Sequence, residues 1–331
     1  MELIIRIPDD FHLHLRQNRT LELCAPLSAA GFARALIMPN TIPPITAPED
    51  LRRYAEEIKN VAPNLSPLLT FKIVPGLDPE QVGRLKKAGA VAGKYYPAGA
   101  TTNAEDGFSD IQAAFPLFHA LQAEDMVLSI HGEDPEAPVF EREEAFLPQV
   151  QTIVDNFPSL RIVLEHLSCR ASVEAVKSWP TRVGATITAH HLAYTVEDLL
   201  GGRLNASLFC KPVVKGRADQ KALIEAAVSG GGRFFFGSDS APHSRKAKNG
   251  GAAGAFTAPV ALPLLAGVLS GAGRIDRLED FCTRFGAEFY RLPLNKEKLS
   301  LRRESWTVPD VYEDIVPLCA GETLEWRVLR A

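Results

Sequence analysis

Near the start of the chain, His12 and His14 stand two residues apart, a spacing that would allow both side chains to bind one ligand. Because successive side chains of a strand alternate between its faces, both imidazoles are expected on one face, with Phe11 and Leu13 on the other. Paired imidazoles suit a divalent ion such as zinc. Arg16, just beyond, adds a fixed cation that suits an anionic substrate.

Short β-branched or aromatic runs alternate with helix-like stretches along the chain. The runs are 3–14, 33–39, 68–74, 91–96, 126–131, 161–166, 183–188 and 233–239, and helix-like stretches include 48–60, 79–88, 111–123, 145–156, 171–178 and 217–228. Strands that alternate with helices predict βαβ units and a parallel sheet, and eight of them predict a closed (β/α)8 TIM barrel. The alternative is an open doubly wound sheet, but the GxGxxG turn typical of that fold is missing.

Polar residues recur at or just past the carboxyl ends of these predicted strands. They are His12, His14, Asn40, Lys94, His131, His166 and Asp239. In a barrel the carboxyl ends of all strands converge on one mouth, where the active site is built. The sequence therefore predicts that these residues meet there.

Composition narrows the class of protein. The 331 residues are 46% hydrophobic and 23% charged with a net charge of −4, which predicts a globular enzyme and disfavours a nucleic-acid or anionic-membrane surface. Five scattered cysteines without a CxxC pair predict neither disulfides nor a thiolate zinc site, and we expect a cytoplasmic protein. The uncharged stretch 250–273 is read as a glycine loop and a buried helix, and no linker divides the single domain expected over 1–331.

Several motifs together resemble one family. They are FHLHLR (11–16), MPN (38–40), GKYYPAGATTN (93–103), IHGE (130–133), EH (165–166) and GSDSAPH (237–243). The set resembles the dihydroorotases of the bacterial type II class, in the amidohydrolase superfamily, over essentially the whole chain. The resemblance implies an amidohydrolase barrel without a flanking β-sandwich domain, a homodimer, and reversible hydrolysis of dihydroorotate to N-carbamoyl-L-aspartate in pyrimidine synthesis.

The resemblance also implies a binuclear metal site. By analogy, His12, His14 and Asp239 hold one ion, His131 and His166 hold the other, and Lys94 bridges both as a carbamate. Nitrogen and oxygen ligands fit two Zn²⁺ ions, with Co²⁺ or Mn²⁺ as substitutes. A bridging hydroxide would attack the ring carbonyl, and Asp239 would carry the proton to the ring nitrogen.

Substrate-binding residues follow from the same resemblance. Arg16, Asn40 and His243 are expected to read the substrate carboxylate, and Thr101 and Thr102 to lie on a mobile lid. Lys211 stands where the family leads us to expect an apolar residue whose backbone contacts the substrate. His190 and His191 are left out of the metal site because the two-ion set is already filled, and the cysteines are interpreted as structural.

Two alternatives remain. Another cyclic amidohydrolase, a hydantoinase or allantoinase, would share the ligands and the bridging lysine, but such enzymes usually carry a flanking β domain. A catalytically silent homologue that acts as an assembly partner is the second alternative, although no expected ligand is missing here.

Overall fold

Eight parallel strands form a barrel in the computed structural model, which describes residues 1–329. The strands pair in chain order as β2 (Asp9–Leu13), β3 (Arg34–Ile37), β4 (Ser66–Lys72), β5 (Ala90–Tyr95), β6 (Val127–Ile130), β7 (Arg161–Leu164), β8 (Val183–Ile187) and β9 (Phe234–Phe236). The barrel closes between β2 and β9, where His14 N donates to Ser240 O at 3.0 Å and Asp239 N to His12 O at 2.8 Å. The predicted TIM barrel is confirmed.

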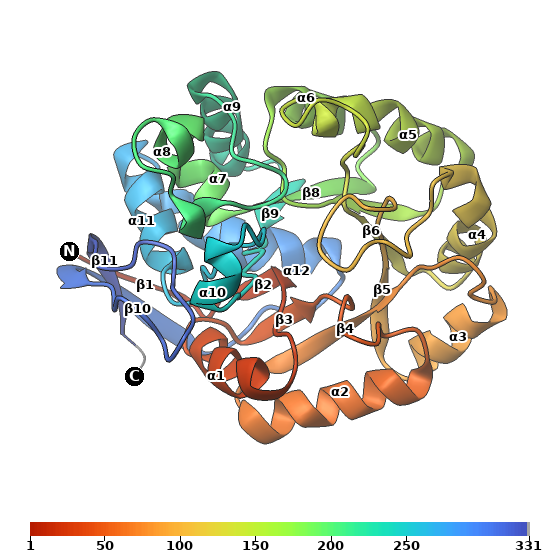
Figure 1. The fold of residues 1–331 in the computed structure, drawn as a ribbon, viewed down its shortest axis with the longest axis horizontal. Helices are drawn as coiled ribbons and strands as arrows, with labels where there is room; N and C mark the ends of the chain where they lie inside the picture. Colours follow the sequence, from red (N-terminus) through yellow and green to blue (C-terminus); the bar gives the residue numbers. More distant parts are fainter. Residues whose placement is uncertain (330–331) are drawn as a thin grey trace.

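Helices surround the barrel (Figure 1). They are α1 (Asn18–Ala29), α2 (Pro48–Val61), α3 (Glu80–Lys87), α4 (Phe115–Ala123), α5 (Arg142–Asn156), α6 (Arg170–Ser178), α7 (Ala189–Ala193), α8 (Val196–Leu200), α9 (Arg217–Val228), α10 (Arg245–Asn249), α11 (Ala261–Gly271) and α12 (Phe285–Phe289). Helix α2 illustrates why they form: Pro48 occupies its first turn with Glu49 and Asp50, where a proline and negative charges are favoured. Helix α11 is the buried helix predicted after the glycine loop.

The apolar core has two parts, one between strands and helices and one inside the barrel. The inner part contains Phe11 with Leu36, Val163 and Phe235, and Tyr290 stacks on the Phe11 ring at 5.0 Å between centroids. The prediction that Phe11 faces the same way as Leu13 is wrong, because Leu13 belongs to the outer part. A shift in register between Asp10 and Leu13 breaks the simple alternation of the strand.

The predicted first strand, 3–14, is in fact two strands in different sheets. Strand β1 (Glu2–Arg6) pairs antiparallel with β10 (Lys298–Thr307), which pairs with β11 (Thr323–Leu329), so both ends of the described chain meet in a three-stranded sheet. Pro8 stands between β1 and β2. Since proline has no N–H to donate to a ladder, it is a natural point for the chain to leave one sheet and enter the other.

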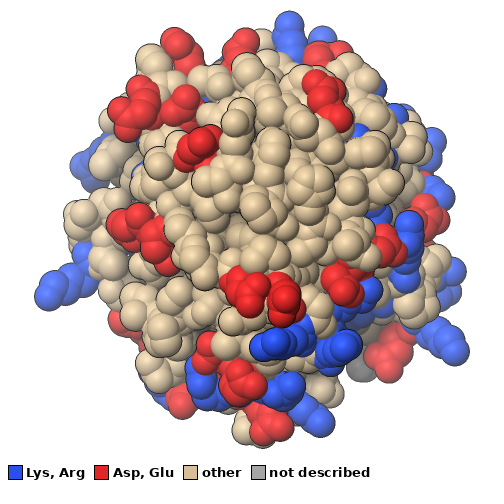
Figure 2. Space-filling model, turned by 90° about the vertical axis from the view of Figure 1, so that its right-hand side faces the viewer, with Lys and Arg blue, Asp and Glu red and all other residues tan. Residues whose placement is uncertain are grey.

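Charged side chains are unevenly spread over the surface. Figure 2 faces the side that carries α3, α4 and α5, where a broad uncharged area is bordered by mixed acidic and basic residues. Among the helices of residues 1–329, none is long and apolar enough to cross a membrane.

Candidate active site

The carboxyl ends of the barrel strands surround a small cavity. The predicted site residues that line it are His12, His14, Arg16, Asn40, Thr101, Thr102, His131, His166, Lys211 and Asp239. Lys94 and His243 are not in this lining, but both lie beside residues that are. The structure therefore brings the whole predicted set to one place.

Three ligand atoms form a triangle at the junction of β2 and β9. His12 Nε2 and His14 Nε2 are 3.3 Å apart, and Asp239 Oδ1 lies 3.3 Å from the first and 3.2 Å from the second. A tetrahedral zinc site with bonds of about 2.0–2.1 Å separates its ligand atoms by roughly 3.3–3.4 Å. The triangle therefore has the size of one face of such a site.

A second pair of imidazoles lies beside the first. His131 Nδ1 is 3.1 Å from His166 Nε2, and the His12 and His166 rings are 5.0 Å apart between centroids. Burial lowers the pKa of His166 well below its usual value, and the neighbouring His131 and His12 act in the same direction. A neutral imidazole keeps the lone pair that a metal ligand needs.

Lys94 has no hydrogen-bond partner although its side chain is fully buried. Its Nζ lies 5.3 Å from the centroid of the Tyr96 ring, and burial lowers the pKa of Lys94 to about 8 against the opposing effects of Glu165 and Asp239. An unpaired buried ammonium is costly, whereas a neutral amine can react with carbon dioxide to form an anionic carbamate. The unpaired nitrogen thus fits a bridging ligand.

Groups behind the ligands orient them. Glu165 Oε2 lies 3.0 Å from His12 Nδ1 and accepts a 2.6 Å hydrogen bond from Thr186. Burial acts to raise the pKa of Glu165, but His12 and Lys94 outweigh it and lower that pKa to about 2. Asn40 Oδ1, 2.8 Å from His14 Nδ1, holds the other imidazole. Both contacts leave the Nε2 lone pairs directed at the triangle.

Three site residues that are not glycine adopt left-handed backbone angles. The φ values are 59° at Arg16, 43° at His166 and 44° at Asp239. Such angles are uncommon for residues with a Cβ and cluster at functional sites. These backbone angles change the direction of the side chains where each strand ends. The alternation of side chains along a strand therefore does not predict where these three side chains point.

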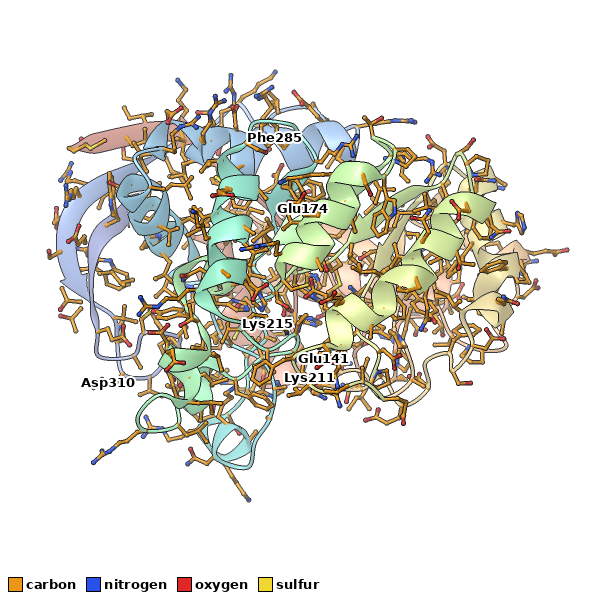
Figure 3. The ribbon with its side chains drawn as sticks, turned by 90° about the horizontal axis from the view of Figure 1, so that it is seen from above. Glu141, Glu174, Lys211, Lys215, Phe285 and Asp310 are labelled. Carbon is orange, nitrogen blue, oxygen red and sulfur yellow. The ribbon has the colours of Figure 1, made fainter. Side chains whose placement is uncertain are left out.

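Part of the cavity lining is cationic. Arg16 Nη2 lies 3.3 Å from His243 Nε2, and the Tyr54 hydroxyl donates to the Arg16 carbonyl at 2.5 Å. Lys211 lines the same cavity, and the segment that carries it with Lys215 leads into α9 (Figure 3). Burial and the Arg16 charge lower the pKa of His243 to about 4, so its ring is neutral at neutral pH. Arg16 and Lys211 together suit an anionic group.

The loop after β5 covers one edge of the cavity and is held by hydrogen bonds that involve Asn40 and Lys72. Asn40 Nδ2 donates to the Thr102 carbonyl at 3.2 Å, and Asn103 Nδ2 donates to the Asn40 carbonyl at 3.1 Å. Buried Lys72, at the end of β4, donates to the Asn103 carbonyl at 2.6 Å and to Asp106. Asn40 therefore contacts both a metal-ligand candidate and the loop.

Sequence reasoning missed the positioning residues Glu165, Thr186 and Lys72. Glu165 precedes His166 within a motif already noted, and that proximity was the one available signal. Thr186 and Lys72 sit in apolar strands and contact the site through residues distant in the chain. Nothing in their local sequence distinguishes them from ordinary strand residues.

Comparison with known proteins gives a consistent result. No family model matches the chain. The dihydroorotase of Teredinibacter turnerae is 43% identical over 333 residues, which cover 97% of this chain and 97% of that protein. The structure of Saccharomyces cerevisiae dihydroorotase in complex with 5-fluoroorotic acid is 35% identical with a TM-score of 0.93, and the match covers 99% of this chain and 98% of that one.

A more distant likeness concerns the fold alone. The L-hydantoinase of Arthrobacter aurescens has a TM-score of 0.85 at 18% identity, over 98% of this chain and 82% of that one. The similarity to dihydroorotases is greater in both sequence and structure and extends along nearly the full length of both partners. The chain belongs to the dihydroorotase family.

Proposed function

We propose that this protein hydrolyses the ring of dihydroorotate reversibly to N-carbamoyl-L-aspartate, with two zinc ions at the barrel mouth. The observation that carries the proposal is the triangle of His12, His14 and Asp239 beside an arginine-lined pocket, in a chain of the dihydroorotase family. The orotate analogue named with the yeast relative is a ring of the same class.

The chemistry of the donor atoms supports two metal ions. His12, His14 and Asp239 would hold one, His131 and His166 the other, and carbamylated Lys94 would join them. When bound, the ions supply Lewis-acid activation of water and of a carbonyl oxygen. Every proposed ligand is nitrogen or oxygen, which suits zinc with cobalt or manganese as substitutes.

The residues of the chain would then divide the remaining work. Asp239 would take the proton from the attacking water and give it to the ring nitrogen as the amide C–N bond breaks. Burial raises the pKa of Asp239, while the neighbouring His12, His131 and Lys94 act to lower it. Arg16, His243 and Asn40 would hold the substrate carboxylate, and Thr101 and Thr102 would close over the ring.

The principal rival is a hydantoinase-like activity on uncharged rings. Arg16 and Lys211 in the pocket argue against it, because a neutral ring offers these cations no carboxylate. A silent homologue is disfavoured because the proposed ligands are all present and gathered together.

The proposed activity can be assayed by the ultraviolet absorbance of dihydroorotate. We expect turnover by the zinc-loaded protein, loss of turnover after chelation, and recovery on addition of zinc with bicarbonate. Hydantoin, which lacks the carboxylate, serves as the comparison substrate. Turnover that survives complete metal removal, or hydantoin hydrolysis at an equal rate, would contradict the proposal.

Replacing Asp239 with Asn should lower kcat by about 10²–10⁴-fold, because the amide cannot carry the proton. Zinc content, measured by mass spectrometry, should stay at the wild-type level since the amide oxygen can still face the ion. Asp276→Asn, on an exposed carboxylate, is the matched control. Full activity of Asp239→Asn would remove this residue as the proton carrier, and loss of zinc would restrict its role to that of a ligand.

Arg16→Met should raise KM for dihydroorotate by about 10–100-fold, because a hydrogen bond to a charged group contributes roughly 1.5–3 kcal/mol. The rate with hydantoin should change little, so the ratio between the two substrates should fall. Arg203→Met removes an exposed arginine and should leave both values unchanged. An unaltered substrate ratio in Arg16→Met would show that another group reads the carboxylate.

Lys72→Met should release the loop from β4, because the buried ammonium supplies contacts to Asn103 and Asp106. We expect KM for dihydroorotate to rise about tenfold, equivalent to ~1.4 kcal/mol, and proteolysis within 99–107 to become faster. The half-exposed Lys86, replaced by Met, is the control. Wild-type KM together with unchanged proteolysis would mean that the loop is held without Lys72.

A further inference from the structure

A second group of metal-binding side chains lies outside the catalytic cavity. His190 and His191 occupy α7, directly after β8, and Cys210 lies in the segment that leads to Lys211. All three side chains are buried, and one ligand atom from each lies within 4.8 Å of the other two. None of the three lines the cavity described above.

The His190 imidazole is an anomaly. Both of its ring nitrogens are buried without a hydrogen-bond partner, a condition shared by no other buried imidazole among residues 1–329. A neutral imidazole has one donor and one acceptor, and leaving both unsatisfied away from water is costly. The other imidazole nitrogen and the lysine nitrogen in this state, on His166 and Lys94, belong to the proposed binuclear site. An absent ligand accounts for the unpaired nitrogens of His190 and Lys94 in the same way.

The neighbouring His191 has both ring nitrogens engaged, and one of these contacts fixes its tautomer. Its Nε2 lies 3.0 Å from the Pro212 carbonyl, so this nitrogen carries the proton and donates it. The Nδ1 lone pair then faces the Thr188 hydroxyl at 2.8 Å, and that hydroxyl also accepts from the His191 backbone N–H. A ring N–H held by a backbone carbonyl supports an imidazole that binds metal through its other nitrogen, and here the Thr188 hydroxyl has to rotate away from Nδ1 to free that lone pair.

Cys210 supplies the third donor atom. Its Sγ lies 3.2 Å from the Pro212 carbonyl as a protonated thiol, and burial raises its pKa to about 12 against the opposing Lys248 and Lys215. Binding of a metal ion therefore has to displace the thiol proton, as is general for cysteine ligands. Lys248 is already engaged by the carbonyls of Phe209, Ala252 and Gly254 at 2.7–2.9 Å.

We propose that His190, His191 and Cys210 form a separate site for one borderline-soft divalent ion, with Zn²⁺ as the first candidate. Two imidazoles and a thiolate are a ligand set that zinc binds in tetrahedral geometry, with the fourth position open. Lys211 follows Cys210 and lines the catalytic cavity, so an ion held here fixes the segment that presents Lys211. The site does not depend on the proposed activity.

Cobalt provides a specific test, because a cobalt–thiolate bond gives a charge-transfer absorption in the near ultraviolet. The proposed binuclear site contains no thiolate, so this band can arise only from a cysteine ligand. The metal-free protein, reconstituted with Co²⁺ and bicarbonate, should show the band and bind one ion per chain more than the variants His190→Ala and Cys210→Ser. Both variants should lose the band.

Cys282→Ser is the matched control, since Cys282 is buried, donates to the Leu278 carbonyl four residues away, and is distant in sequence from Cys210. It should keep the band and the full metal content. Should His190→Ala unfold, His190→Gln gives the same comparison with a side chain of similar polarity. The thermal midpoint of each variant identifies any that fails to fold.

Two outcomes would overturn the proposal. One is saturation with Co²⁺ without a thiolate band and with equal metal content in wild type and variants, which would mean that His190 is paired by water. The other is a band that persists in both variants, which would place the thiolate elsewhere. Neither readout requires turnover, so failure of this site and failure of the proposed function remain distinguishable.

Discussion

The two backbone hydrogen bonds between β2 and the segment after β9 are the interaction on which the rest of the structure depends. They join His14 N to Ser240 O and Asp239 N to His12 O. The same bonds that close the barrel therefore set the separation of the three ligand atoms at 3.2–3.3 Å. Closure of the fold therefore also assembles the first three ligands of the proposed metal centre.

Burial then determines the chemical state of the gathered groups. Away from water, the imidazoles of His12 and His14 and the Lys94 amine have lowered pKa values, while Asp239 has a raised one. These shifts favour neutral nitrogens with free lone pairs, which are what a cation binds. Buried polar atoms without hydrogen-bond partners, such as Lys94 Nζ, cost free energy in the unliganded protein. A bound ligand would offset that cost.

Asn40 connects the ligands to the loop that borders the cavity. Its side chain holds His14 through the oxygen and the Thr102 carbonyl through the nitrogen. Movement of the loop consequently changes the support of a proposed metal ligand, and the orientation of His14 affects the loop in return. Lys72 adds an anchor on the far side of the loop that comes from a different strand. The cavity is therefore shaped by contacts among three neighbouring strands.

The sequence alone determined the eight barrel strands, their parallel arrangement and the identity of the residues at the mouth. It could do so because β-branched runs and the alternation with helices are local signals, and because parallel strands end on one side. The family resemblance was carried by short motifs such as HLHLR and DSAPH and by the one that contains Lys94. Such motifs are contiguous in the chain, so they too are local signals.

Tertiary structure alone decided how the side chains are aimed and which remote groups support them. The direction of Phe11 depended on a register shift, and those of His166 and Asp239 on left-handed backbone angles. The division of 3–14 into two strands depended on pairing with β10, nearly 300 residues along the chain. The approach of Cys210 to the histidines of α7 likewise brings together segments that no local pattern relates. Each of these depends on free energies of packing between distant segments, which a local sequence pattern does not contain.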